Sequence, residues 1–423
     1  MKFFLFLFFF TMPFFLLSQD YNWELEVAPY GRNVNKIHIY KDGKIFILGG
    51  NPRNDSIQFA AEKRDAATEW VVRLDNPGKP MINDAYFKGD EIYAAGDNYS
   101  FLISNNRGLE WEEKSLPQTD SIVNFYSVAV TQDNDIFIVG GRIGKDSTGI
   151  IYKSSDDGLT WSVSDFMVPC LKSVYFVDGQ NGFSAGEKGA VLQTKDAGNT
   201  WTSLDIMDAQ VARYFEDIMF IDENKGFILG GNIVSDSVQT ILRTDDGGET
   251  WLAIIDEIGP VLKDLDFLGS DFGIAVGNNG ASLRTDDGGD TWEPFQLPEV
   301  NELWFFNTVY IHNLNTALIG GNVGAIFWSV DYGTLSSKEV GLPSYLVDVS
   351  PNPTTGLLHI NYTGELMIKK LEIYDLKGQK LKSVNWQGGR KLQLDISDLD
   401  KSLYLLKLID TENNYLTRMI IKH

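Results

Sequence analysis

The sequence predicts an all-β protein in which a seven-bladed β-propeller is followed by a small antiparallel β-sandwich. Three observations carry this prediction. A turn that ends in tryptophan recurs every 40 to 50 residues along most of the chain. Four short apolar strands fit into each period, which is the make-up of a propeller blade. After Gly333 the period breaks, and from Pro343 onward apolar and polar residues alternate.

The recurring turn has the same chemistry in each copy. Its clearest copies are TDDGGETW at 244–251, TDDGGDTW at 285–292, TKDAGNTW at 194–201 and SSDDGLTW at 154–161, and weaker ones are SNNRGLEW at 104–111, KRDAATEW at 63–70 and SVDYGTL from 329. The aspartate can accept hydrogen bonds from N–H groups of its own turn, and the glycine adopts a conformation that strains other residues. The tryptophan opens the next strand and buries its ring. We therefore expect structural roles for Asp65, Asp156, Gly158, Trp161, Asp196, Gly198, Trp201, Asp246, Gly248, Trp251, Asp287, Gly289, Trp292 and Asp331.

The tryptophans of the turns give the number of blades. Six occupy the turn position, at residues 70, 111, 161, 201, 251 and 292, and the seventh copy has Ser336 instead. Trp23 lies far upstream, in the short strand-like segment 22–27. We expect Trp23 to Val27 to supply the outer strand of the last blade, beside the strand that precedes Ser329. Such closure removes the open edges of a linear array, and seven blades follow.

The turn matches the pattern S/T-x-D-x-G-x-T-W, and in this the chain resembles the Asp-box propellers, whose BNR repeats also occur in the sialidase-like superfamily. The strand motif G-F/Y-x-x-G before each turn is similar to the photosystem II assembly and stability factor family over roughly residues 23–335. That resemblance implies a seven-bladed, non-enzymatic propeller. It says far more about fold than about role.

The loops alternate in length between neighbouring blades. The loop after the second strand is long in blades one, three and five, at 50–58, 141–149 and 231–239, and short in the others. We expect these loops to share one face with the links between blades, opposite the repeated turns. Because loops carry function, this face is the candidate binding surface. Its candidate residues are Asp55, Asp146, Asp236, Arg213, Tyr214, Glu216 and Trp304, the last next to Phe305 and Phe306 as an aromatic platform.

The N-terminus has the pattern of an export signal. Lys2 is followed by an apolar run from Phe3 to Leu17, and Ser18 precedes a polar stretch. A transmembrane anchor is the alternative, although the run is short for a membrane-spanning helix. We expect residues 1–18 to be a signal peptide, 19–337 the propeller, 338–345 a linker and 346–423 the terminal domain. No integral membrane segment is expected in the mature chain.

Composition excludes several functions. A net charge of −22 argues against nucleic acid, which needs a basic surface. The four histidines show no metal-ligand spacing, and the single Cys170 can form no intrachain disulfide. Calcium binding by the carboxylate pairs Asp245–Asp246 and Asp286–Asp287 is left open, but the ligand series of an EF-hand is missing. We predict no metal and no cofactor.

The C-terminal part carries a second set of motifs. They are SPNP at 350–353, IYDLKG at 373–378, YLLKL at 404–408 and the basic end at 418–422. These residues resemble the C-terminal sorting domain of the type IX secretion system, with Ser402 where that family usually has glycine. The resemblance implies partners in the type IX machinery and its sorting protease. It also implies passage through the periplasm of a Gram-negative bacterium, removal of the domain, and release or attachment at the outer surface. An ordinary carbohydrate-binding or immunoglobulin-like module is the alternative.

The propeller is interpreted as a secreted or cell-surface module that binds a protein or glycan. The alternative is a divergent, sialidase-like glycosidase acting in the channel. A sialidase-like site needs converging arginines with a tyrosine nucleophile and acidic partners. Arg243 and Arg284 occupy equivalent repeat positions, which favours structural roles, and the one suggestive cluster lies at 213–216. We assign no catalytic residue, since repeated carboxylates do not make one asymmetric site.

Overall fold

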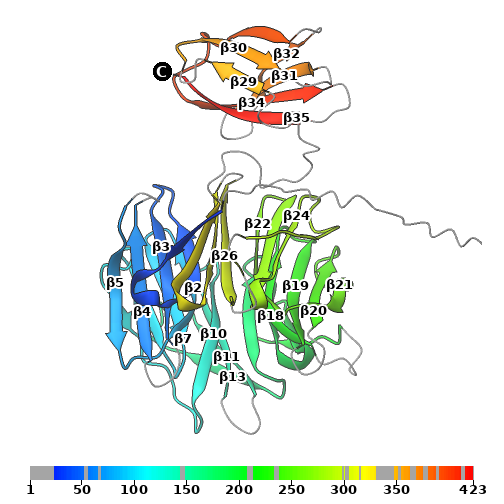
Figure 1. The fold of residues 1–423 in the computed structure, drawn as a ribbon. Helices are drawn as coiled ribbons and strands as arrows, with labels where there is room; N and C mark the ends of the chain where they lie inside the picture. Colours follow the sequence, from blue (N-terminus) through cyan, green and yellow to red (C-terminus); the bar gives the residue numbers. More distant parts are fainter. Residues whose placement is uncertain are drawn as a thin grey trace, which may run out of the picture.

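The protein is described from a computed structural model, shown in Figure 1, in which every regular element of the described part is a strand or a short 3-10 turn. The structure describes residues 23–422 apart from 52–55, 65–67, 143–147, 207–212, 233–237, 298–299, 301–303, 314–315, 330–346, 351–353, 363–367, 375–379, 387–389 and 411–414. Among these residues no helix has the length and apolar character needed to span a bilayer. The predicted signal peptide lies outside the described residues.

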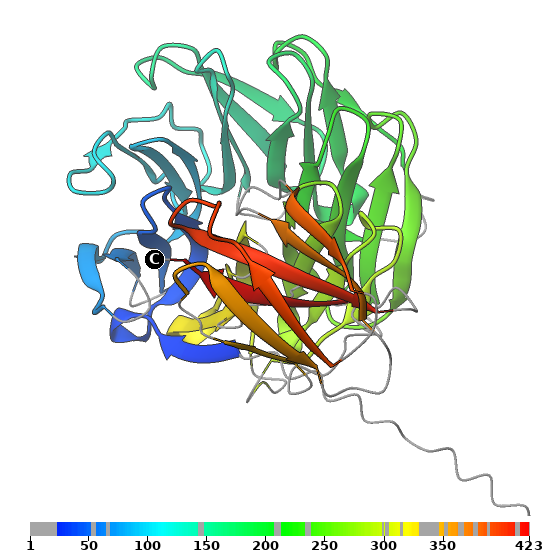
Figure 2. The ribbon, with the colours of Figure 1, turned by 90° about the horizontal axis from the view of Figure 1, so that it is seen from above.

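Seven four-stranded antiparallel sheets follow one another around a ring in chain order (Figure 2). This confirms the predicted seven-bladed propeller. Blade one consists of β2 (Asn33–Ile39), β3 (Ile45–Asn51), β4 (Ile57–Lys63) and β5 (Val71–Pro77). Blade two consists of β6 (Ile82–Lys88), β7 (Glu91–Gly96), β8 (Phe101–Ser104) and β9 (Glu112–Glu113). Blade three consists of β10 (Val123–Val130), β11 (Ile136–Arg142), β12 (Gly149–Ser154) and β13 (Ser162–Phe166).

Blade four consists of β14 (Leu171–Phe176), β15 (Gly182–Gly186), β16 (Val191–Thr194) and β17 (Thr202–Ser203). Blade five consists of β18 (Tyr214–Phe220), β19 (Gly226–Asn232), β20 (Val238–Thr244) and β21 (Leu252–Ile258). Blade six consists of β22 (Leu262–Leu268), β23 (Phe272–Gly277), β24 (Ser282–Thr285) and β25 (Glu293–Pro294). The described 3-10 turns are η1 (Pro29–Gly31), η3 (Glu187–Gly189), η4 (Asn278–Gly280) and η5 (Asn322–Gly324).

The seventh blade joins the two ends of the propeller sequence. It contains β26 (Phe306–Asn313), β27 (Thr316–Gly321) and β28 (Ala325–Ser329), with β1 (Trp23–Val27) as its outer strand. β1 pairs antiparallel with β28, so that Trp23 lies opposite Ser329 and Val27 opposite Ala325. The closure predicted from Trp23 is therefore present.

The hydrophobic core lies between neighbouring sheets. A phenylalanine of the second strand packs against the tryptophan that follows the turn of the next blade, with ring centroids 6.3 to 6.5 Å apart. These pairs are Phe46–Trp111, Phe137–Trp201, Phe183–Trp251 and Phe227–Trp292. Since aromatic residues bury large apolar areas, each blade is stabilised chiefly by its neighbours.

The C-terminal part forms two small antiparallel sheets around one core. One has the order β29 (Val347–Ser350), β30 (Leu357–Tyr362), β33 (Lys391–Asp395). The other has the order β32 (Lys380–Asn385), β31 (Ile368–Tyr374), β34 (Leu403–Asp410), β35 (Tyr415–Ile421). Residues such as Leu358, Leu371, Trp386 and Leu406 from both sheets share a buried cluster, which is the predicted sandwich.

Candidate functional site

The first strands of all seven blades surround a central cavity of ≈ 440 Å³. This volume falls in the range of small-ligand sites. Two faces of the propeller border it. The loops between second and third strands meet the links between blades on one face, as in the bond from Gly189 N to Arg213 O (2.7 Å). The repeated turns meet the first hairpin turns on the other, as in Gly247 N to Asn224 O (2.8 Å). We call these the loop face and the turn face.

Each first strand carries a β-bulge at the same place, close to its start at the loop face. The register against the second strand shifts there in every blade, for example between Phe215 and Asp217. A bulge inserts one extra residue and re-aims its side chain. The bulge residues are Asn35, Asn83, Tyr126, Lys172, Glu216, Lys263 and Asn307, and all of them line the cavity.

Three of the bulge residues link the blades to one another. The Asn35 amide donates to Ile82 O (2.7 Å), that of Asn83 to Phe125 O (2.8 Å), and that of Asn307 to Val34 O (3.3 Å). In each case the acceptor is the residue before the bulge of the next blade. Blades seven, one and two therefore share one structural solution at this position.

The bulge residues of blades three to six differ from that solution. The Lys172 ammonium lies 3.5 Å from the ring centroid of Tyr126 and 3.3 Å from the Glu187 carboxylate. Lys263 Nζ lies 2.7 Å from Glu216. We call Tyr126, Lys172, Glu216 and Lys263 the charged arc. It is contiguous over four blades and lies at the loop-face end of the cavity.

The next level of the cavity holds a lysine among carboxylates. Lys36 Nζ lies 3.0 Å from Asp84. Burial lowers the pKa of Lys36, but the charges of Asp84, Asp264 and Asp217 outweigh it and hold that pKa above its usual value. Lys36 thus acts as an internal counter-ion for carboxylates from three other blades.

The carboxylates of the cavity are tied to the backbone of the following blade. Asp84 Oδ2 accepts from Val128 N (3.1 Å) and Asp264 Oδ2 from Val309 N (2.7 Å). Asp266 Oδ2 accepts from Ile311 N (2.6 Å). These bonds position the first strands against one another.

Burial raises the pKa of several of these acids. It raises the pKa of Asp266 to about 7, with the nearby Asp264 charge adding to the effect and backbone N–H groups opposing it. The pKa values of Asp217 and Asp264 are also raised, first by burial. The pKa of Asp266 therefore lies close to neutral pH.

The turn-face end of the cavity is aromatic. His38 stacks on Phe87 with centroids 4.3 Å apart and meets Tyr310 edge-on at 5.3 Å. Burial, assisted by the charges of Lys36 and His312, lowers the pKa of His38 to about 4. Tyr86 and Tyr175 line the same end. His38 is accordingly neutral at physiological pH.

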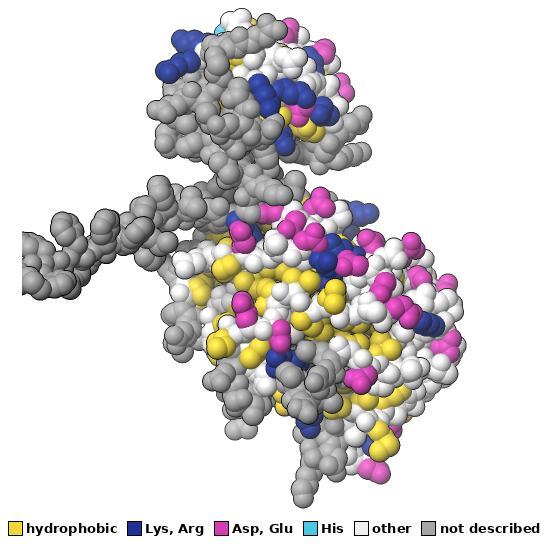
Figure 3. All heavy atoms as spheres, turned by 90° about the vertical axis from the view of Figure 1, so that its right-hand side faces the viewer, with side chains coloured by type: hydrophobic (Ala, Val, Ile, Leu, Met, Phe, Trp, Pro, Cys, Tyr) yellow, Lys and Arg dark blue, Asp and Glu magenta, His cyan; other side chains and the backbone are white. Residues whose placement is uncertain are grey.

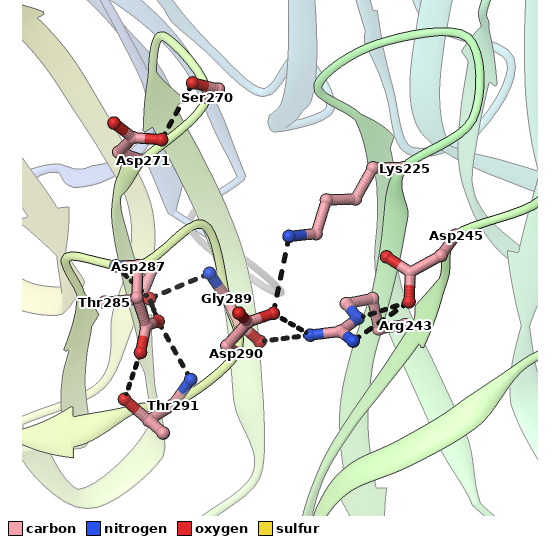
Figure 4. Close-up of polar contacts among 10 residues, drawn as sticks. All are labelled: Lys225, Arg243, Asp245, Ser270, Asp271, Thr285, Asp287, Gly289, Asp290 and Thr291. Atoms are coloured by element: carbon pink, nitrogen blue, oxygen red, sulfur yellow. Dashed lines mark hydrogen bonds and ion pairs between the residues drawn. The ribbon is translucent and has the colours of Figure 1, made fainter.

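The repeated turns of the turn face are held together by side-chain hydrogen bonds. In the turn at 285–292, Asp287 accepts from Thr285 Oγ1 (2.8 Å), Thr291 N (2.9 Å) and Thr291 Oγ1 (2.6 Å), as Figure 4 shows. The same pattern surrounds Asp156, Asp196 and Asp246. These four carboxylates are engaged inside their own turns. The assignment of these turns to the Asp-box type remains a prediction.

Adjacent turns are also joined by ion pairs. Arg243 reaches Asp245 (2.9 Å) within its own blade and Asp290 (2.5 Å) in the next, and Lys225 approaches Asp290 (3.6 Å) (Figure 4). Arg243 therefore links two blades.

The sequence-predicted binding residues occupy varied places. Arg213 is buried and makes a two-point ion pair with Asp256 at 2.9 Å for each nitrogen. Trp304 is half-buried and packs edge-on against Phe327. Tyr214 begins β18 and is half-buried, and Glu216 lines the cavity. Asp55, Asp146 and Asp236, like Asp65 and Asp331 of the turns, lie outside the described residues.

Sequence reasoning missed most residues that line the cavity. Lys36, Lys172, Asp217, Lys263 and Asp264 lie on ordinary apolar strands with no motif around them. Aligning the first strands by repeat, and asking where equivalent positions differ, would have found them.

The described surface and side-chain clusters agree with an acidic protein. Figure 3 shows acidic side chains over the side that carries β20 and β21, with hydrophobic side chains between them and few lysines or arginines. Within the described ranges, no group of three or more histidine, cysteine or acidic residues has the arrangement of a metal site.

Comparison with known proteins identifies the C-terminal part. Residues 348–422 match the family described as secretion system C-terminal sorting domain. The chain ends in a type IX sorting domain. Proteins that carry this domain are exported by type IX secretion to the cell surface or the outside, and the same holds for this propeller.

Solved structures similar to the chain are also propellers. Ycf48 bound to D1 peptide is 17% identical, with a TM-score of 0.55 over 74% of this chain and 96% of that one. Ycf48 from Cyanidioschyzon merolae is 17% identical, with a TM-score of 0.52 over 73% and 98%. PorZ, a surface component of the type-IX secretion system of Porphyromonas gingivalis, is 11% identical, with a TM-score of 0.54 over 94% and 60%. At these identities the likeness establishes the fold alone.

Two curated relatives match part of the sequence. The photosystem II assembly lipoprotein Ycf48 of Synechococcus sp. (strain CC9902) is 24% identical over 146 residues, or 34% of this chain. A xyloglucanase of Paenibacillus sp. is 28% identical over 165 residues, or 37% of this chain. The matches span only 40% and 13% of the length of these relatives.

Proposed function

We propose that this exported propeller is a non-enzymatic binding module, which holds a protein or glycan ligand at the loop-face opening of its channel. The observation that carries the proposal is the cavity of ≈ 440 Å³, whose polar and aromatic lining differs from blade to blade. A concave site with a few converging polar groups is the usual place for a ligand.

The bonding of the cavity carboxylates supports binding rather than catalysis. A catalytic carboxylate must be free to exchange a proton with, or to attack, a substrate. In each of Asp84, Asp264 and Asp266, one carboxylate oxygen accepts a hydrogen bond from a backbone N–H of the following blade. Their arrangement is that of structural acids at the edge of a site.

Similar proteins support both ligand classes. The solved Ycf48 holds a peptide of D1, and the Paenibacillus relative is a xyloglucanase. The printed names of these two similar proteins thus point to a polypeptide and a polysaccharide, and extracellular polymers fit the exported location.

For the two ends of the chain we propose removal. The signal peptide at 1–18 would be cleaved near Gln19, and the sorting domain would be cut from the propeller during export. Mass spectrometry of culture medium and cells tests this. Peptides ending near residue 345 are expected, and an intact tail on the mature protein would contradict it.

The binding role is tested with the purified mature chain. A glycan array that includes xyloglucan oligosaccharides, an affinity capture of surface proteins, and a panel of chromogenic glycosides are run side by side. Saturable binding without turnover is expected. Hydrolysis of a glycoside would exclude the non-enzymatic role.

A glycosidase acting in the channel is the second candidate, because Asp266 has a pKa of about 7 and could hold a proton for a leaving group. If this candidate holds, Asp266→Asn abolishes turnover of whichever glycoside the native chain cleaves. If the binding role holds, neither protein shows turnover.

A further inference from the structure

The charged arc breaks a repeat that the rest of the ring keeps. Three consecutive blades use an asparagine at the bulge, and each amide donates to the carbonyl before the bulge of the next blade. In the following four blades the same position holds Tyr126, Lys172, Glu216 and Lys263. A carboxylate such as Glu216 cannot donate that hydrogen bond at all.

These four blades therefore lack the asparagine that links each of blades seven, one and two to the next blade. Repeat proteins keep a residue where it serves the stacking of neighbouring units. Departures from such local rules collect at functional sites. The four departures are contiguous and line one wall of the cavity at its loop-face end.

The side chains of the arc are open to the cavity but held in place. The exposed fractions of the Lys172, Glu216 and Lys263 side chains are 16%, 19% and 29%. The two lysines are fixed by their carboxylates at 3.3 and 2.7 Å. A ligand would therefore meet donors and acceptors that are already oriented, which lowers the entropy cost of binding.

The charges of the arc define the ligand. Lys172 pairs with Glu187, which is not among the residues that line the cavity, and Lys263 pairs with Glu216, so each ammonium of the arc has its own carboxylate and the two pairs carry no net charge. Such a wall favours neither an anion nor a cation. It alternates strong donors with strong acceptors, which matches the adjacent hydroxyl groups of a sugar.

The opposite wall has the same character. Asn35, Asn83 and Asn307 place carboxamide groups around the same opening. A peptide usually needs an apolar or aromatic anchor pocket, whereas six of the seven bulge residues around this opening are asparagine, lysine or glutamate. Deeper in the cavity, Tyr86, Tyr175 and Tyr310 add aromatic side chains to the lining.

We infer that the charged arc is a subsite for the terminal residue of an uncharged glycan, which enters the channel end-on from the loop face. The inference rests on the proposed binding function and names the ligand class of that site. The cavity volume of ≈ 440 Å³ accommodates one or two sugar residues, which limits recognition to the end of the chain.

The repeat itself supplies the test variant. Glu216→Asn with Lys263→Asn removes both members of the ion pair, leaves the net charge unchanged, and installs the residue that three other blades carry. The new amides could donate to Leu262 O and Phe306 O, the equivalents of the acceptors in those blades. The unfolding midpoint is therefore expected to stay the same or to rise.

A matched control is available on the turn face. Lys195 and Glu249 form an exposed ion pair of the same length, 2.7 Å, in neighbouring turns. Lys195→Asn with Glu249→Asn makes the same chemical change far from the channel opening. It should leave both folding and binding unaltered.

The experiment measures binding of the full mature chain and both double variants to an array of neutral and charged oligosaccharides, followed by titration of the free oligosaccharides that bind. An uncharged glycan is expected to bind the native chain and the control alike. The arc variant should bind it about tenfold more weakly or worse.

Three results would overturn the inference in distinguishable ways. If the arc variant binds the glycan as tightly as the native chain, the arc is not the subsite, although the binding function stands. Binding of charged glycans alone, or retention of a surface protein in the affinity capture with no glycan bound, would refute the ligand class. If the native chain binds no ligand of any kind, the proposed function itself fails.

Discussion

The Lys63 ammonium of the first blade lies 2.5 Å from the Glu26 carboxylate of the seventh, and the Lys63 side chain has no exposed surface. The same carboxylate accepts hydrogen bonds from Trp70 Nε1 (2.8 Å) and Trp328 Nε1 (2.9 Å). The ammonium lies 5.0 and 4.5 Å from the centroids of these two indole rings. One carboxylate of β1 thus joins the first blade to the last.

Breaking this pair from one side should destabilise the propeller severely. Glu26→Ala removes the carboxylate that contacts the buried Lys63 ammonium and the two indole N–H groups, and loss of one partner of a buried pair costs about 3–5 kcal/mol. Urea unfolding of the mature chain measures the change. Glu24→Ala, an exposed position on the same strand, is the control and should have little effect.

Removing both charges should recover much of the loss. Glu26→Leu with Lys63→Met replaces the pair by apolar side chains of similar volume, and such exchanges are often neutral. A double variant as unstable as Glu26→Ala would mean that the two indole N–H bonds, rather than the buried charge, hold the closure together.

Gly248 makes a second, steric contact between blades. It has a φ of +88°, and a Cβ built on it would lie 2.5 Å from the Phe183 ring. Gly248→Ala should destabilise the propeller by about 2 kcal/mol, because the ring has to move and the backbone is strained. Gly269 has a φ of +68° with open space around it, so Gly269→Ala carries the strain alone.

Calorimetric or urea unfolding of the two glycine variants separates these effects. Gly248→Ala is expected to be the less stable by a clear margin. Equal losses would show that conformation alone explains the need for glycine, and that the phenylalanine adjusts freely.

How far the sequence predicts this protein depends on how local each feature is. The turn at 244–251 is held by contacts within four residues, such as Thr250 N to Asp246 Oδ1 (2.9 Å), so its letters reveal it. The strand at Trp23 could be placed because the ring has to close. The proximity of Lys36 and Asp217 could not be predicted, because the two residues belong to distant blades. Only the folded ring brings their side chains into one cavity. The buried bond from Arg213 to Asp256 is likewise invisible along the chain.

The sorting domain predicts the fate of a truncated chain. Deletion of residues 348–422 removes the part that matches the sorting family. The shortened propeller should reach the periplasm and stay there, while the full chain appears at the surface or in the medium. Cell fractionation with antibody detection measures the distribution. Truncated propeller in the medium, without leakage of a periplasmic marker, would contradict the prediction.

The acids of the channel predict an unusual dependence of stability on pH. Burial raises the pKa of Asp266 from 3.8 to about 7. Between these values the folded state keeps a proton that the unfolded state has released. The contribution of Asp266 to the free energy of unfolding is therefore full below about pH 4 and is lost as the pH rises through about 7.

Asp266→Asn isolates this contribution. His38, whose pKa is lowered by burial to about 4, acts in the opposite sense, because the folded state resists protonation below pH 6.5. The native profile therefore mixes both signs, and the difference between native and variant profiles is the informative quantity. Between pH 4 and 7 the unfolding midpoint of the native chain should fall more steeply, or rise less, than that of Asp266→Asn.

The control is Asp271→Asn, an exposed change in the neighbouring hairpin turn, which should keep the native profile. Parallel profiles for native chain and Asp266→Asn would mean that Asp266 is already ionised in the folded channel, held by the N–H groups of Phe267 and Ile311.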